Sequence, residues 1–115
     1  MASLTGFQRD NKGIYIIKDP DANLSYALDF VDYLQSGDTL STATASLQTI
    51  TGDTDPLAFP TNAATDVSIS GTKVILRVEG GTDGNVYDVK VTITTTEGDT
   101  DVRHFRIVVK EKQLN

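Results

Sequence analysis

Apolar and polar residues alternate along much of the chain. The clearest case is residues 24–30, where Leu24, Tyr26, Leu28 and Phe30 occupy every second position. Successive side chains of a strand point to opposite faces, so this period of two predicts a strand with one buried face. The alternation recurs at residues 87–93 and 105–109. The pattern favours an all-β protein.

Turn-forming residues divide the chain into about seven such segments. The predicted strands are 13–18, 24–30, the flat Thr- and Ala-rich stretch 39–52, 66–70, 73–79, the segment after the 80–84 loop, and 102–112. Residues 31–34 fit either a continued strand or a short helical turn, and 52–66 read as a loop. Seven short strands at this spacing predict an immunoglobulin-like antiparallel β-sandwich over residues 14–115. Residues 1–13 show no period and are predicted to be a flexible N-terminal arm.

The last two strands are expected to form a hairpin. Closing the turn with a Thr96–Thr100 pair places Val91 opposite Phe105 and Lys90 opposite Arg106, with His104 opposite Thr92. The inward pairs are then apolar, as a hairpin over a core requires. Tyr87 begins the penultimate strand, where such sandwiches often carry a tyrosine corner. We therefore expect its hydroxyl to hold the crossover loop and its role to be structural.

Composition narrows the class further. The 115 residues suit one domain, and sixteen Thr with thirteen Asp suit strands joined by turns. The absence of Cys excludes disulfides and thiolate chemistry. No window resembles a membrane span or a signal peptide, so we expect a soluble protein made in the cytoplasm, with no membrane partner.

Candidate chemistry is sparse. His104 is the single histidine, and its predicted outward position favours a surface residue over a general base. The Asp19/Asp21, Asp53/Asp55 and Asp99/Asp101 pairs could supply oxygen ligands to Ca²⁺, but Asp is also the ordinary residue of turns. We expect no catalytic, cofactor-binding or metal-ligating residue, and no cofactor.

Charge is distributed unevenly. The net charge of −6 argues against a nucleic-acid partner, which would require a basic surface. Residues 1–60 carry −5 of this charge and residues 61–115 carry −1. The basic side chains predicted on one outer face are Lys90, His104, Arg106 and Lys110. We call these four the basic ridge, and the hypothesis is that it contacts an acidic surface of another copy or of a partner subunit. Neutralisation by Asp88 or Glu79 is the alternative.

Several short motifs resemble those of a known family. They are Lys18-Asp19-Pro20-Asp21-Ala22, Tyr26, Asp29-Phe30 before Leu34, Gly37-Asp38-Thr39-Leu40, Gly81-Thr82, Gly84-Asn85-Val86-Tyr87, Ile93-Thr94-Thr95 and Gly98-x-x-Asp101-x-Arg103. Across residues 14–110 the chain resembles small virion proteins of tailed bacteriophages and prophages, of the fibre–tail adaptor or head-associated type.

The resemblance implies a non-enzymatic structural role. It implies an adaptor at the neck or tail that joins fibres or a collar to the particle, with capsid decoration as the alternative. Partners would be neck, tail, fibre or capsid subunits, and the protein would be a homo-oligomer in the virion. The N-terminal arm and the exposed sheet edges would be its docking elements. A carbohydrate- or Ca²⁺-binding host-attachment module is a third possibility.

Overall fold

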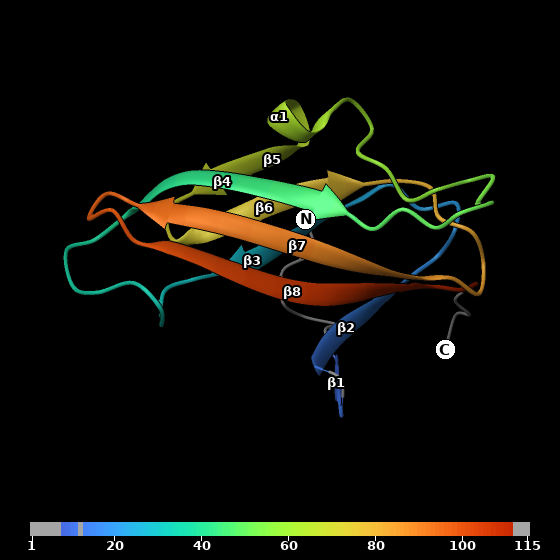
Figure 1. Ribbon diagram of the computed structural model, residues 1–115, viewed down its shortest axis with the longest axis horizontal. Coiled ribbons are helices and arrows are strands. Elements are labelled where there is room, and N and C mark those ends of the chain that lie inside the picture. Colours follow the sequence, from blue (N-terminus) through green and yellow to red (C-terminus); the bar gives the residue numbers. More distant parts are fainter. Residues whose placement is uncertain (1–7, 12, 112–115) are drawn as a thin grey trace.

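The structure is a computed structural model that describes residues 8–11 and 13–111 (Figure 1). Its strands are β1 (Gln8–Asp10), β2 (Gly13–Lys18), β3 (Leu24–Asp29), β4 (Leu40–Leu47), β5 (Val67–Ser70), β6 (Lys73–Val78), β7 (Val86–Thr95) and β8 (Thr100–Val109). One short helix, α1 (Ala63–Asp66), precedes β5. No helix among the described residues is long and apolar enough to cross a membrane.

The strands form two sheets that pack as a sandwich. One sheet has the order β1-β2-β8-β7-β4 and the other β3-β6-β5, and Figure 1 shows the first in front of the second. All pairings are antiparallel except that of β2 with β8, which is parallel. The predicted all-β sandwich is confirmed, and its immunoglobulin-like character stays a prediction.

The core lies between the two sheets. Every second residue of β6, of β7 and of β8 from Phe105 onward is buried, as the alternation predicted. The buried apolar side chains of these three strands are Val74, Leu76, Val78, Tyr87, Val89, Val91, Ile93, Phe105, Ile107 and Val109. Removing such side chains from water is the main stabilising contribution to the fold.

Backbone pairing decides two local predictions, the hairpin around Gly71-Thr72 and the conformation of residues 31–34. β5 and β6 form the expected hairpin, in which Ser70 pairs with Lys73 across Gly71-Thr72. After β3, the Tyr33 and Leu34 amides both donate to the Phe30 carbonyl, at 3.0 and 3.1 Å. Residues 31–34 therefore make a helical turn rather than a longer strand.

The predicted register of the last hairpin is wrong by two residues. Thr94, not Thr96, pairs with Thr100, so Lys90 faces His104, Asp88 faces Arg106, and Val89 faces Phe105. The Thr95 amide donates to the Asp99 carbonyl at 2.9 Å, which leaves Thr96-Glu97-Gly98 as a three-residue loop. Gly98 has φ +96°, and hairpin loops of this length need a residue with positive φ at that position. A shift of two keeps each residue on its predicted face and changes only its partner.

The N-terminal arm is described only in part. Residues Gln8–Asp10 form β1, which pairs with the beginning of β2 through Gln8–Tyr15 and Asp10–Gly13 (Figure 1). Three residues of the predicted arm are thus part of a hairpin, while residues 1–7 and 12 lie outside the described residues. The domain boundary after residue 13 stays a prediction.

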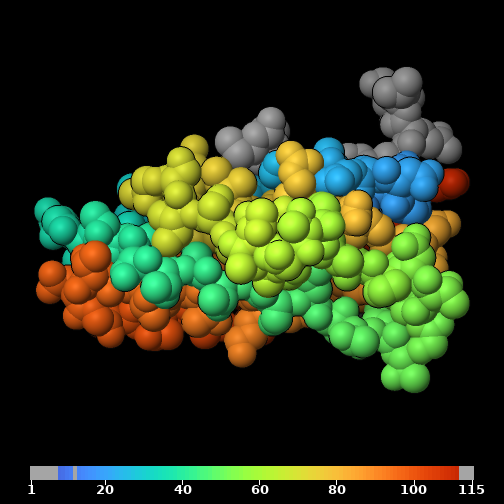
Figure 2. All heavy atoms as spheres, turned by 90° about the horizontal axis from the view of Figure 1, so that it is seen from above, coloured from blue at the N-terminus to red at the C-terminus, as the bar shows by residue number. Residues whose placement is uncertain are grey.

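The helix α1 lies beside two edge strands, one from each sheet. β4 ends the first sheet and β5 ends the second, and α1 lies against both. Figure 2 shows the segment that carries α1 lying across the middle of this side of the molecule. The uncharged strand β4 therefore has a neighbouring segment along part of its length.

Candidate interaction surfaces

The structure places the basic ridge on and beside β7 and β8. Lys90, His104 and Lys110 are exposed, and the Arg106 side chain is 19% exposed. His104 lies opposite Lys90, whereas the sequence had predicted Thr92 there, and Arg106 lies opposite Asp88 instead of Lys90. The like-charge pair predicted at Lys90–Arg106 is therefore absent.

Two members of the ridge are paired with carboxylates. The His104 Nδ1 lies 2.8 Å from the Asp88 Oδ2, and an Arg106 Nη lies 2.5 Å from the Asp10 Oδ1. The Arg106 guanidinium also sits 5.3 Å from the centre of the Tyr15 ring. Asp88 is one of the two neutralising acids that the sequence suggested. Glu79, the other, instead accepts a hydrogen bond from Asn23 at 3.4 Å.

The two lysines of the ridge, Lys90 and Lys110, differ from His104 and Arg106 in their ion pairing. In the part of the chain that the structure describes, no carboxylate lies within 4.0 Å of the Lys90 or Lys110 ammonium. Lys90 borders a shallow hollow of about 320 Å³ together with Ser46, Gln48 and His104. The unpaired positive charge of the ridge is thus concentrated at its lysines.

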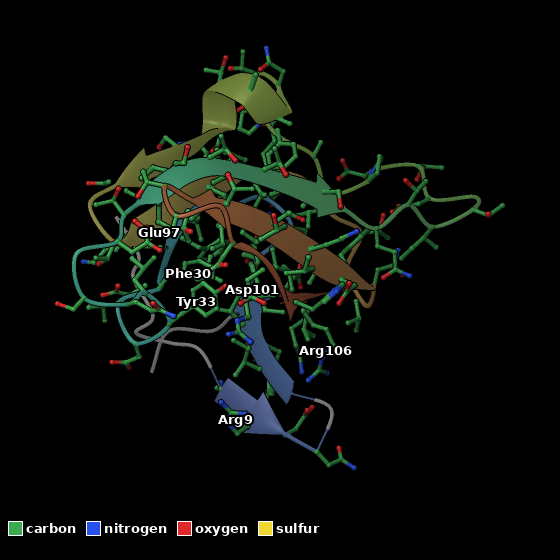
Figure 3. The ribbon with its side chains drawn as sticks, turned by 60° about the vertical axis from the view of Figure 1, so that its left-hand side comes forward. Arg9, Phe30, Tyr33, Glu97, Asp101 and Arg106 are labelled. Carbon is green, nitrogen blue, oxygen red and sulfur yellow. The ribbon has the colours of Figure 1, made fainter. Side chains whose placement is uncertain are left out.

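A more apolar hollow of about 270 Å³ opens between β2, β3 and the first half of β8. We call this hollow the edge hollow. The apolar residues that line it are Ile14 from β2, Leu28 from β3, and Phe30 and Tyr33 from the helical turn. Arg103 lies over the Tyr33 ring at 5.5 Å and forms an ion pair with Asp101 at 2.9 Å. Figure 3 shows Phe30, Tyr33 and Asp101 gathered on this side. Desolvation, followed by the Asp101 and Asp99 carboxylates, raises the pKa of Tyr33.

The edge hollow lies beside an incompletely paired strand. β7 pairs with β8 from Thr100 to Val108, whereas β2 pairs with it only from Arg106 to Val109. Among the described residues, no strand pairs with the other side of β8 over residues 100–104. An exposed strand edge is a template for a further strand. One feature of the sequence pointed to this edge, because Tyr33 is an aromatic residue outside the regular alternation.

Tyr87 is fully buried and its hydroxyl joins two loops. It accepts a hydrogen bond from the Thr82 amide at 3.1 Å and donates one to the Asp53 carboxylate. The Thr82 hydroxyl also donates to Asp53. Hydrogen bonds from Thr82 and then Tyr87 hold the pKa of Asp53 below its usual value. This is the geometry expected of a structural tyrosine, although the tyrosine-corner assignment stays a proposal.

Two of the three Asp pairs serve local turns in this structure. The Asp21 amide donates to the Asp19 Oδ1 at 2.9 Å, and the Asp55 amide donates to the Asp53 Oδ1 at 3.2 Å. Asp101 forms the ion pair with Arg103. Within residues 8–11 and 13–111, no group of three or more His, Asp or Glu side chains could hold a metal ion.

Lys18 is a cation whose burial was not predicted from the sequence. Its side chain is fully buried, and its Nζ donates to the carbonyls of Asp19 at 2.9 Å and Gly80 at 2.6 Å. Burial lowers the pKa of Lys18, and the Asp19 and Asp55 carboxylates oppose that effect. The residue ties the end of β2 to the β6–β7 connection.

Together, these features define a small β-sandwich module whose distinctive groups lie on its outer face and at a strand edge. A family model described as "Podophage GP4 fiber-tail adaptor protein gp77" matches residues 18–108. The chain belongs to this family of phage fibre–tail adaptor proteins, which confirms the resemblance to phage virion proteins and the structural adaptor role at the tail. No curated protein matches the chain.

Proposed function

We propose that several copies of this protein assemble in the virion and connect the tail to its fibres without catalysing a reaction. The match of residues 18–108 to the fibre–tail adaptor family carries the proposal. An adaptor needs at least two contact surfaces, and the basic ridge and the edge hollow are suitable candidates. Repetition of the module around the tail would strengthen individually weak contacts through avidity. Synthesis in the host cytoplasm belongs to the same proposal.

The basic ridge is the surface we assign to an acidic partner. His104 and Arg106 are engaged by Asp88 and Asp10, so Lys90 and Lys110 supply its available charge. An exposed lysine can meet a partner carboxylate without first breaking an ion pair. Such contacts affect association rate and salt dependence more than affinity.

Complementation with phage particles tests the adaptor function. Particles assembled without this protein should keep tails but lack fibres in electron micrographs, and the wild-type protein should restore them. Particles that keep their fibres, or a labelled protein found over the capsid surface, would contradict the proposal and favour capsid decoration.

Charge reversal tests the ridge separately. Particles complemented with the Lys90→Glu/Lys110→Glu variant should carry fewer fibres than wild-type particles. The difference should be largest at low salt and should shrink as salt screens these charges. Lys73→Glu, on β6 of the other sheet, is the matched control for an exposed lysine. Arg106 is unsuitable for this test because its loss would also release Asp10. Full fibre attachment in the double variant at low salt would exclude the ridge as a contact.

A further inference from the structure

The open side of β8 has a defined set of pairing groups. At one end of the β7–β8 hairpin the Thr95 amide donates to the Asp99 carbonyl, and at the other the Val109 amide donates to the Asn85 carbonyl, both at 2.9 Å. Hydrogen-bonded and non-bonded pairs alternate in an antiparallel ladder. The odd-numbered residues of β8 therefore bond to β7, and the backbone groups of Thr100, Val102 and His104 point to the open side.

The end of the strand agrees with this assignment. On the side away from β7, the Lys110 amide donates to the Lys18 carbonyl at 3.0 Å, as an even-numbered residue should. β2 thus uses the far end of the same row of groups. Residues 100–104 are the remainder of that row, and they form an edge five residues long.

The sequence of this edge is complementary to itself. Thr100-Asp101-Val102-Arg103-His104, placed antiparallel to a second copy with Val102 at the centre, sets Asp101 opposite Arg103 of the second copy, and Arg103 opposite its Asp101. A two-fold axis at Val102 repeats both ion pairs, as an interface between identical surfaces requires. We propose that two copies of the chain associate through this antiparallel pairing of β8 with β8.

The ladder geometry suits these partners. Val102 would form a reciprocal hydrogen-bonded pair with its counterpart, because its backbone groups point to the open side. Asp101 and Arg103 would then occupy the non-bonded positions, where opposed side chains approach more closely. The one register therefore satisfies both the backbone and the charges.

Charge and exposure favour a second copy as the occupant. The whole chain carries −6, so most surfaces of two copies repel each other. Asp101 and Arg103 balance within this edge, where they pair with each other at 2.9 Å in one chain and would exchange partners between two chains. The Arg103 side chain is 54% exposed, and Val102 is an exposed apolar residue at 38%. Arg103 also lines the edge hollow, so the pairing would cover part of that apolar rim.

The inference deepens the proposed homo-oligomer by naming its surface, and charge exchange tests it. Sedimentation velocity over a range of concentrations should show a monomer–dimer equilibrium for the wild-type protein. Asp101→Arg and Arg103→Asp each place like charges opposite each other, so each variant should dimerise about ten-fold more weakly or worse. Asp83→Arg, in an exposed loop, and Lys73→Asp change the net charge equally and should dimerise like the wild type.

Mixing the two edge variants is the decisive arm. In a mixed dimer, the arginines of one variant face the aspartates of the other, so the mixture should recover wild-type association, as should the doubly exchanged protein. Because the recovery needs both folded variants, misfolding cannot imitate it. Failure of the mixture to associate would overturn the pairing.

Hydrogen exchange on the wild-type protein gives a second readout. The Val102 amide should exchange more slowly as the protein concentration rises, while the Arg103 amide, already bonded to β7, should not change. A wild-type protein that stays monomeric at about 1 mM would overturn both this inference and unaided self-association. Association that ignores the edge variants would overturn the inference alone, and would point to residues 1–7 or another surface.

Discussion

The Tyr87 hydroxyl donates a hydrogen bond to the carboxylate of Asp53, 34 residues earlier in the chain. The bond joins the β4–β5 connection to the beginning of β7, and Thr82 strengthens it by donating to the same carboxylate. A buried hydroxyl with a charged acceptor is among the more costly polar groups to remove.

Tyr87→Phe should destabilise the protein by about 1–2 kcal/mol, because the Thr82 amide and the Asp53 carboxylate lose their common partner. Urea unfolding with the slope held constant measures the change. Tyr15→Phe is the control, because the Tyr15 hydroxyl makes an exposed bond to Gln8 at 3.1 Å and its loss should cost little. Equal effects of the two substitutions would refute the structural role of Tyr87.

Low pH should remove the contribution of the Asp53 carboxylate to folding stability. Its pKa is lower in the folded protein than the unfolded value of about 3.9, so the stabilisation is complete above that value and is lost as pH falls through the folded pKa. The stability difference between wild type and Tyr87→Phe should therefore shrink at low pH. Unfolding midpoints between about pH 2.5 and 7 measure it, and a difference independent of pH would show that Asp53 is not the acceptor that matters.

Alanine substitutions at Gly81 and Gly84 would distinguish the cost of a steric clash from the cost of backbone strain. Gly81 and Gly84 have φ of +101° and +91°, but only at Gly81 would a Cβ meet another side chain, the Val109 Cγ2 at 2.7 Å. Gly81→Ala should cost more than Gly84→Ala by roughly 1–3 kcal/mol, the usual effect of overpacking. Thermal unfolding of both variants tests this, and equal melting temperatures would contradict the close approach of the 80–84 loop to β8.

Arg106 should hold β1 against the sheet. Its guanidinium contacts Asp10 at 2.5 Å and the Gly13 carbonyl at 3.3 Å, beside the Tyr15 ring. Arg106→Gln should speed amide exchange in residues 8–10 while lowering global stability by no more than about 1 kcal/mol. Arg77→Gln, on β6, removes bonds to Asn23 and Ser25 and should leave β1 unchanged. Unaltered exchange in β1 would mean that pairing with β2 alone holds it.

Side-chain period determined most of the secondary structure from the sequence alone. The inward positions of β7 and β8 follow from the pleat, so Val89 and Phe105 were assigned to the core correctly although their partners were not. Register was missed because period two cannot distinguish a shift of two residues. The register was set by the turn, in which Gly98 adopts a positive φ.

Tertiary structure decided the candidate surfaces. No local pattern states that β2 meets β8 only from Arg106 onward, yet this leaves residues 100–104 open and places Tyr33 beside Arg103. No local pattern predicts the ion pair of Asp88 with His104 or the burial of Lys18. The sequence by itself determined which face is buried in the regularly alternating strands such as β6 and β7, because that depends on neighbouring residues. The structure decided which edges and charges remain available, because those depend on segments far apart in the chain.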